Sequence, residues 1–118
     1  MTTAPAGEAL AREYGESRRR ISDLLADAGA EVASTRIPAC PEWSVQSLSS
    51  HVTGIAADLV GRRNPGPDVQ AWVDAQIAER ADRPLADVLA EWNDVGPRFE
   101  QLIERMPGLS QVDRMGRI

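Results

Sequence analysis

The chain has 118 residues, of which 42% are hydrophobic and 26% charged, so it can bury a core and is too apolar to be wholly disordered. Its net charge of −5 makes nucleic acid a poor partner, because binding a phosphate backbone requires an excess of Lys and Arg. The single cysteine, Cys40, excludes an internal disulfide, and no apolar run is long enough to cross a membrane. We therefore expect one cytoplasmic domain spanning residues 1–118.

A first helix is predicted from the spacing of apolar residues after a frayed lead-in at residues 1–6. The helix should run from Gly7 to about Ala28 and stop at Gly29, because glycine readily adopts the left-handed conformation that ends helices. The basic residues 18–20 are interpreted as a solvated face of this helix rather than a binding patch.

A second helix should begin at Val45, because the hydroxyl of Ser44 can accept a hydrogen bond from an unpaired N–H of the first turn. The prolines before it predict a rigid loop over residues 38–43, and the Gly/Pro-rich residues 61–67 end it. Its apolar residues share one face, which predicts that this face is buried. They are Val45, Leu48, Val52, Ile55 and Leu59. His51 lies one step around the helix from this stripe, at the margin of the core.

Two further helical segments are predicted, and no strands, because period-two alternation is absent. Residues 68–81 have an apolar side and Asp68 as their N-terminal cap. A last helix, capped by Asp82, should carry an apolar face over residues 85–106 with a kink at residues 96–97, where Pro97 removes a backbone hydrogen bond. Pro107 and Gly108 should end it, and residues 109–118 show no sustained pattern.

Little catalytic chemistry is visible, since the chain lacks a phosphate-binding glycine loop, a paired-cysteine zinc site and a nucleophile elbow. No catalytic residue can be assigned. His51, the only histidine, is either a metal ligand or a structural residue. Asp58 and Glu91 could complete a metal site from neighbouring helices, or be ordinary solvated carboxylates. Cys40 is either an exposed, reactive thiol or a small apolar filler, and the absence of an adjacent basic residue favours the filler.

Two sequence stretches suggest a family. The stretch IPACPEWSVQSLSSHVTG at residues 37–54 and the stretch RPLADVLAEW at residues 83–92 resemble the mycothiol-dependent maleylpyruvate isomerase N-terminal domain, a family of the DinB-like superfamily. The resemblance implies an antiparallel four-helix bundle. It also implies that His51 is one of three protein ligands to a divalent metal, usually zinc, and that a small thiol such as mycothiol is a partner.

The chain departs from the family pattern in one respect. The resemblance places the other two ligands, a carboxylate and a histidine one turn apart, on a later helix, and no second histidine occurs here. We therefore expect an all-α DinB-like bundle that is incomplete, with three long helices and a short one. Such a domain would bind metal weakly and be inactive alone, because catalytic zinc normally has three protein ligands.

A missing helix would also uncover an apolar groove, which predicts a homodimer. The alternative to a metal-binding domain of the isomerase or transferase type is a non-catalytic helical module that self-associates, or binds a partner, through this groove. The sequence alone does not decide whether the chain is an enzyme.

Overall fold

The computed structural model describes residues 6–105, which form five helices and one two-stranded antiparallel sheet. The elements are α1 (Ala6–Leu24), α2 (Ala30–Ala33), β1 (Arg36–Ile37), β2 (Cys40–Ser44), α3 (Val45–Val60), α4 (Val69–Arg80) and α5 (Leu85–Glu104). The predicted all-α class is confirmed. Apart from Ala6, which begins α1, the irregular segments predicted at residues 1–6 and 109–118 lie outside the described residues, as does the predicted stop at residues 107–108.

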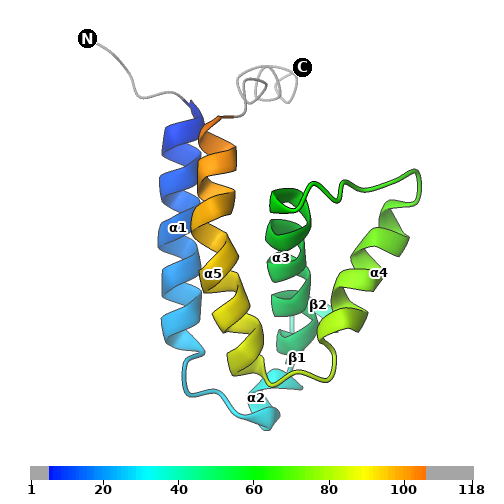
Figure 1. Cartoon of the computed structure of the whole chain (residues 1–118). Coiled ribbons are helices and arrows are strands. Elements are labelled where there is room, and N and C mark those ends of the chain that lie inside the picture. Colours follow the sequence, from blue (N-terminus) through cyan, green and yellow to red (C-terminus); the bar gives the residue numbers. More distant parts are fainter. Residues whose placement is uncertain (1–5, 106–118) are drawn as a thin grey trace.

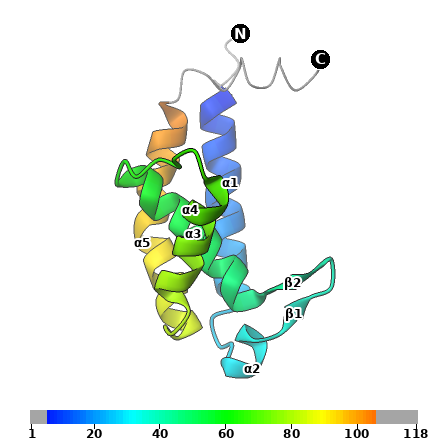
Figure 2. The same cartoon turned by 90° about the vertical axis from the view of Figure 1, so that its right-hand side faces the viewer.

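The long helices are arranged around α5, which packs against both α1 and α3 (Figure 1). Helix α4 packs against α3 and lies on the side of α3 away from α1. Consecutive long helices alternate in direction, so α5 is antiparallel to α1 and runs in the same direction as α3. The β1–β2 hairpin and the single turn of α2 lie together at the end of the bundle where α3 begins (Figure 2).

Aromatic contacts hold α1 against α5. The indole N–H of Trp92 donates a hydrogen bond of 2.7 Å to the hydroxyl of Tyr14, and Tyr14 also meets Phe99 edge to face at a centroid distance of 5.1 Å. Burial raises the pKa of Tyr14 above its ordinary value, although the bond to Trp92 opposes that shift. Trp92 also belongs to the buried cluster that joins α5 to α3, made of Ala56, Leu85, Leu89 and Trp92. This indole therefore connects the two halves of the core.

Arg18 is buried, with 6% of its surface exposed, so the predicted solvated face is wrong for this residue. Its guanidinium group donates to Glu100 Oε2 at 3.1 and 3.3 Å, and also to Asn93. Gly96 makes room for it, because a Cβ there would lie 2.3 Å from Arg18 Nε. Helix α5 continues through Pro97, and its axis bends along its length (Figure 1), as the predicted kink requires.

Helix α3 begins at Val45 as predicted, with a complete capping box between Ser44 and Ser47. The predicted burial of its apolar stripe is met only in part, because Val45 and Val52 pack against the buried cluster but no member of the stripe is fully buried. Leu48 is 40% exposed and the other four members of the stripe are half-buried. The buried positions carry mostly small or polar side chains, namely Ser49, Ser50, Thr53, Gly54, Ala56 and Asp58. Small side chains let α4 and α5 approach closely, so this face is buried more deeply than the apolar one.

The turns and caps differ from prediction at several points. Residues 38–43 belong largely to a β-hairpin, which escapes a period-two search because most of its side chains are exposed on both faces. Helix α1 ends at Leu24, and Gly29, with φ of −92°, is the N-cap of α2 rather than a left-handed stop. Asp68 caps α4 as predicted. Asp82 does not cap α5, whose N-cap position is taken by Pro84 without a side-chain bond.

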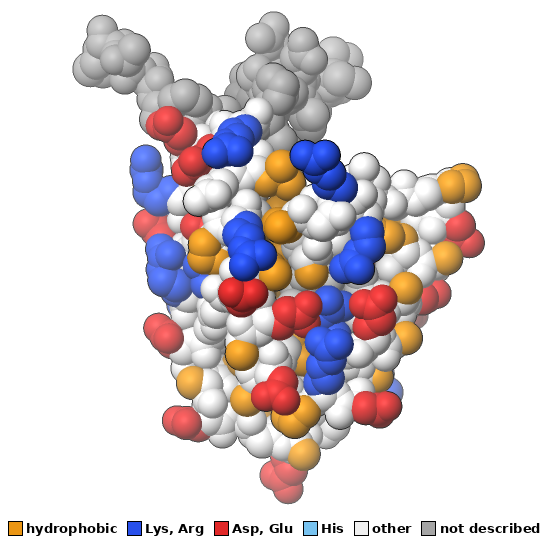
Figure 3. Space-filling view, in the orientation of Figure 1, with side chains coloured by type: hydrophobic (Ala, Val, Ile, Leu, Met, Phe, Trp, Pro, Cys, Tyr) orange, Lys and Arg blue, Asp and Glu red, His pale blue; other side chains and the backbone are white. Residues whose placement is uncertain are grey.

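The surface carries interspersed charges rather than a patch of one sign on the face drawn in Figure 3. Arginine side chains there lie next to Asp and Glu side chains. Among residues 6–105, none of the helices has the length and apolar character required to cross a membrane.

Candidate functional site

His51 lies half-buried on α3, on the side that faces α4. Its Nδ1 atom is 2.8 Å from Oε1 of Gln76, a residue of α4. The ring of Trp43, near the end of strand β2, lies against the imidazole with a centroid distance of 5.5 Å. The predicted position of His51 at the margin of the core is therefore confirmed, and the ring is held between an amide and an indole.

A polar chain extends from His51 along α3. The Nε2 amide of Gln76 donates a bond of 3.0 Å to Asp58 Oδ2, and Asp58 Oδ1 is 3.0 Å from the guanidinium group of Arg63. His51 and Asp58 are seven residues apart, which is two helical turns, so both side chains project from the same face of α3. Gln76 spans the distance between them from the neighbouring helix.

Close approach of the two helices is made possible by Gly54. A Cβ at this position would lie 2.5 Å from both Cβ and Cγ of Gln76, so any side chain larger than hydrogen would push α4 away. Gln76 is almost completely enclosed as a result, with 1% of its surface exposed. The residue that contacts His51 is therefore fixed by packing as well as by hydrogen bonds.

An ion pair holds α4 against α5. Arg80, one turn after Gln76, donates from Nε and NH2 to the two carboxylate oxygens of Glu91 at 2.8 and 2.7 Å, and from NH1 to the backbone oxygen of Gln76. Hydrogen bonds from Arg80 hold the pKa of Glu91 below its ordinary value, and Glu91 in turn raises the pKa of Arg80. Arg83 adds a second cation to Glu91.

These contacts show whether Asp58 and Glu91 are available as metal ligands beside His51. Asp58 is bonded to Gln76 and Arg63, and Glu91 is bonded to Arg80 and Arg83. Neither joins His51, and residues 6–105 contain no group of three His, Cys, Asp or Glu side chains suited to a metal. Of the two alternatives for Asp58 and Glu91, the one in which they complete a metal site is not supported by the described residues, and His51 remains the one candidate ligand among them.

Cys40 is exposed at the start of β2, so the prediction that it fills a small apolar gap is wrong. Gln76 falls within the helix predicted over residues 68–81, but no functional role was predicted for it. A signal was available, because a glutamine on an otherwise apolar helical face needs partners for its amide when it is buried.

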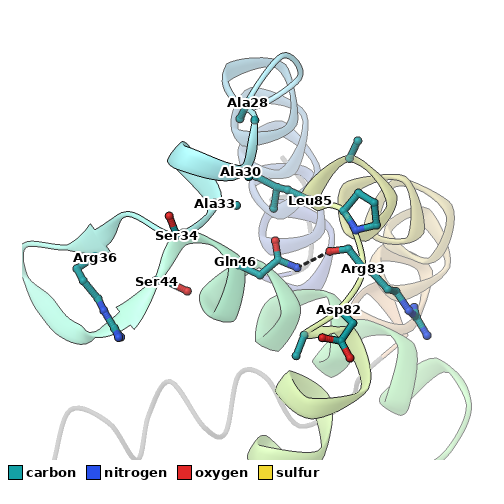
Figure 4. A pocket seen from close by; sticks show the side chains of 14 residues that line it. Ala28, Ala30, Ala33, Ser34, Arg36, Ser44, Gln46, Asp82, Arg83 and Leu85 are labelled. Carbon is teal, nitrogen blue, oxygen red and sulfur yellow. Dashed lines mark hydrogen bonds between the residues drawn. The ribbon is translucent and has the colours of Figure 1, made fainter.

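Three hollows in the described surface lie away from His51, and two of them bear on function. The larger, of about 680 Å³, lies between the hairpin, α2 and the α4–α5 turn, and Figure 4 shows Gln46 inside it donating to the backbone oxygen of Arg83. Alanines line much of it, and its arginines, Arg36 and Arg83, already bond to Glu42 and Glu91. We find no cluster of reactive side chains there.

The smaller hollow, of about 230 Å³, is an apolar groove between α1 and α3. It is lined by Ile21, Leu24, Leu25, Ile37, Val45, Leu48, Ser49, Val52 and Trp92, and this set is called the α1–α3 groove below. The apolar stripe of α3 contributes three of these residues, so part of the stripe predicted to lie in the core also forms one wall of the groove.

Comparison with known proteins supports the resemblance noted in the sequence. The model of the mycothiol maleylpyruvate isomerase N-terminal domain family matches residues 14–116, which include α3 with His51 and all of α4 and α5. No curated protein and no solved structure matches the chain. Because the match covers most of the sequence and the structure has the expected helical architecture, the chain belongs to the mycothiol maleylpyruvate isomerase N-terminal domain family, in the DinB-like superfamily.

Proposed function

We propose that this domain binds a divalent metal, zinc being the one that the family implies, with His51 as a protein ligand. The observation that carries the proposal is the state of the imidazole: Nδ1 is bonded to Gln76, and no hydrogen bond among residues 6–105 involves Nε2. Histidine ligands characteristically bind metal through one nitrogen while the other bonds to an oxygen of the protein. The arrangement of His51 has this form.

The residues described do not by themselves fit a complete metal site. A catalytic zinc normally has three protein ligands and a water, and His51 has no second candidate beside it. The other ligands must therefore come from outside residues 6–105, and a chain that supplies His51 alone should bind zinc weakly and have no isomerase activity. When a complete site is formed, the metal would lower the pKa of a small thiol such as mycothiol, or polarise a carbonyl group.

Zinc titration of the purified chain tests this proposal. Because the chain has a single histidine and a single cysteine, binding can be assigned by comparing the wild type with His51→Ala and Cys40→Ser. We expect the His51 variant to lose zinc binding and the Cys40 variant to keep it. Equal zinc affinity in the wild type and the His51 variant would rule out the histidine as a ligand.

The α1–α3 groove favours a second candidate function, self-association of a non-catalytic module. Leu24 is 81% exposed and Leu48 is 40% exposed, and both contribute to one continuous apolar lining. Contiguous apolar surface of this kind is typical of association sites in soluble proteins. We propose that a second copy of the chain covers the groove.

Sedimentation velocity over a range of protein concentrations tests the dimer. Leu48→Lys should shift the chain to a monomer, because a charge in the centre of an apolar interface would be buried without a partner. Val69→Lys is the matched control, because Val69 is 55% exposed on α4 and does not line the groove. A wild-type chain that stays monomeric at all concentrations tested would exclude this second function.

A further inference from the structure

Gln76 is a bridging side chain whose two polar ends are both occupied. Its Oε1 lies 2.8 Å from Nδ1 of His51, and its Nε2 lies 3.0 Å from Oδ2 of Asp58. The amide is buried between the two helices, where the missing side chain of Gly54 admits it. A bonded and enclosed amide of this kind imposes its orientation on its neighbours.

The direction of each bond follows from the chemistry of the groups. A carboxylate only accepts hydrogen bonds, so the NH₂ end of Gln76 must point at Asp58 and the carbonyl end at His51. The carbonyl oxygen also only accepts, so Nδ1 of the imidazole must carry the proton. A neutral imidazole has one N–H, which leaves Nε2 with its lone pair.

We propose that Gln76 and Asp58 are positioning residues that hold His51 in the Nδ1–H tautomer with Nε2 as its binding atom. This assignment rests on the proposed function only in naming a metal as what Nε2 binds. The pair is held in turn by Arg63, which bonds to Asp58, and by Arg80, which bonds to the backbone oxygen of Gln76. In this arrangement α4 places the amide of Gln76 beside His51.

Nitrogen-15 NMR of the imidazole tests the tautomer without any metal. The chain has one histidine, so its ring signals are unambiguous, and spectra are recorded where the shifts no longer change with rising pH. We expect the wild type to be mainly Nδ1–H. Gln76→Leu should revert to the Nε2–H form that free histidine prefers in water, because Nδ1 loses its acceptor.

Two further variants separate positioning from general packing. Gln46→Leu is the matched control, because Gln46 also joins α3 to the end of α4 by hydrogen bonds but does not touch His51. It should keep the wild-type tautomer. In Asp58→Asn the amide oxygen stays toward Arg63 and the NH₂ group faces Gln76, so Gln76 should turn its own NH₂ group to the ring and favour the Nε2–H tautomer. This variant serves as the test should Gln76→Leu not fold.

The outcomes distinguish this inference from the proposed function. A wild-type ring that is mainly Nε2–H, or a tautomer unchanged in both Gln76→Leu and Asp58→Asn, would overturn the positioning role whatever the metal result. With Zn²⁺ as the probe, Gln76→Leu should bind about 10–100-fold more weakly than the wild type, the usual effect of removing a histidine's hydrogen-bond partner. Tautomers as expected together with no effect of Zn²⁺ on the ring signals would keep the positioning role and refute the metal.

Discussion

Replacing Gly54 by alanine tests the close approach of α3 and α4 on which the environment of His51 depends. A glycine inside an exposed helix is a weak point, and alanine there raises the free energy of unfolding by about 1 kcal/mol. For a domain of this size, that gain alone would raise the melting temperature by about 4–8 °C.

The structure instead predicts that this substitution does not raise the free energy of unfolding and can lower it. The new Cβ would lie 2.5 Å from two carbons of Gln76, whereas packed carbons sit about 3.5–4.0 Å apart, so α4 would have to shift by about 1 Å. Gln76 cannot turn aside, because both of its ends are bonded. Overpacking of this kind costs about 1–3 kcal/mol, which outweighs or cancels the helix gain.

We therefore expect Gly54→Ala to leave the melting temperature unchanged or to lower it by up to about 10 °C. Thermal unfolding followed by circular dichroism measures this. Gly66→Ala is the control, because no atom lies within 4 Å of a Cβ there and the change should be neutral or slightly stabilising. A Gly54→Ala protein that melts several degrees above the wild type would refute the tight crossing of the two helices.

Three other substitutions test the remaining supports of the fold by denaturant unfolding. Because the pKa of Glu91 is lower in the folded chain, its ion pair with Arg80 stabilises the fold fully above the ordinary pKa of 4.5 and is lost as pH falls below it. Glu91→Gln should therefore cost about 1–3 kcal/mol at neutral pH and little in strong acid, and an equal cost at both would contradict the pairing. Tyr14→Phe should cost about 1–3 kcal/mol, because the buried indole N–H of Trp92 loses its acceptor, and a neutral result would mean that the bond is not formed. Ser44→Ala should cost about 1 kcal/mol through loss of the α3 cap, whereas an unchanged midpoint would show that Ser44 does not cap the helix.

The features that were predicted correctly from the sequence depend on residues that are close together along the chain. The cap at Ser44 and the cap at Asp68 were predictable because each side chain bonds to a backbone N–H three residues away. His51 was singled out by its motif and by being the only histidine. Contacts between distant residues were not predictable in the same way. Gln76 meets residues 25 and 18 positions away on another helix, and nothing in its own helix indicates which side chains those are.

The predictions for residues 38–43 and for Arg18 were wrong for related reasons. A strand is recognised by alternation only when one of its faces is buried, and β2 exposes three of its five residues in succession. Arg18 is a basic residue in a basic run, and its burial depends on the missing side chain of Gly96, which lies on α5 far along the sequence. The glycine was noticed only as part of a kink, whereas its other role is to admit a guanidinium group.

The apolar stripe of α3 shows what periodicity identifies. Val45, Leu48 and Val52 were assigned to the core because their spacing places them on one face. Val45 and Val52 do pack against the core cluster, but the same face also lines the α1–α3 groove. Small residues such as Thr53 and Gly54 meet α5 and α4. Periodicity therefore identifies the apolar face of a helix, but it does not identify the element that packs against that face. Residues 6–105 leave the groove open, and His51 projects from the same helix without its other ligands. The groove opens toward α1 and His51 faces α4 (Figure 1), so a second copy seated in the groove would not reach the imidazole. Sedimentation of the zinc-titrated samples checks this: zinc should bind without shifting the chain toward the dimer, and a zinc-dependent dimer would place the second copy beside His51 instead.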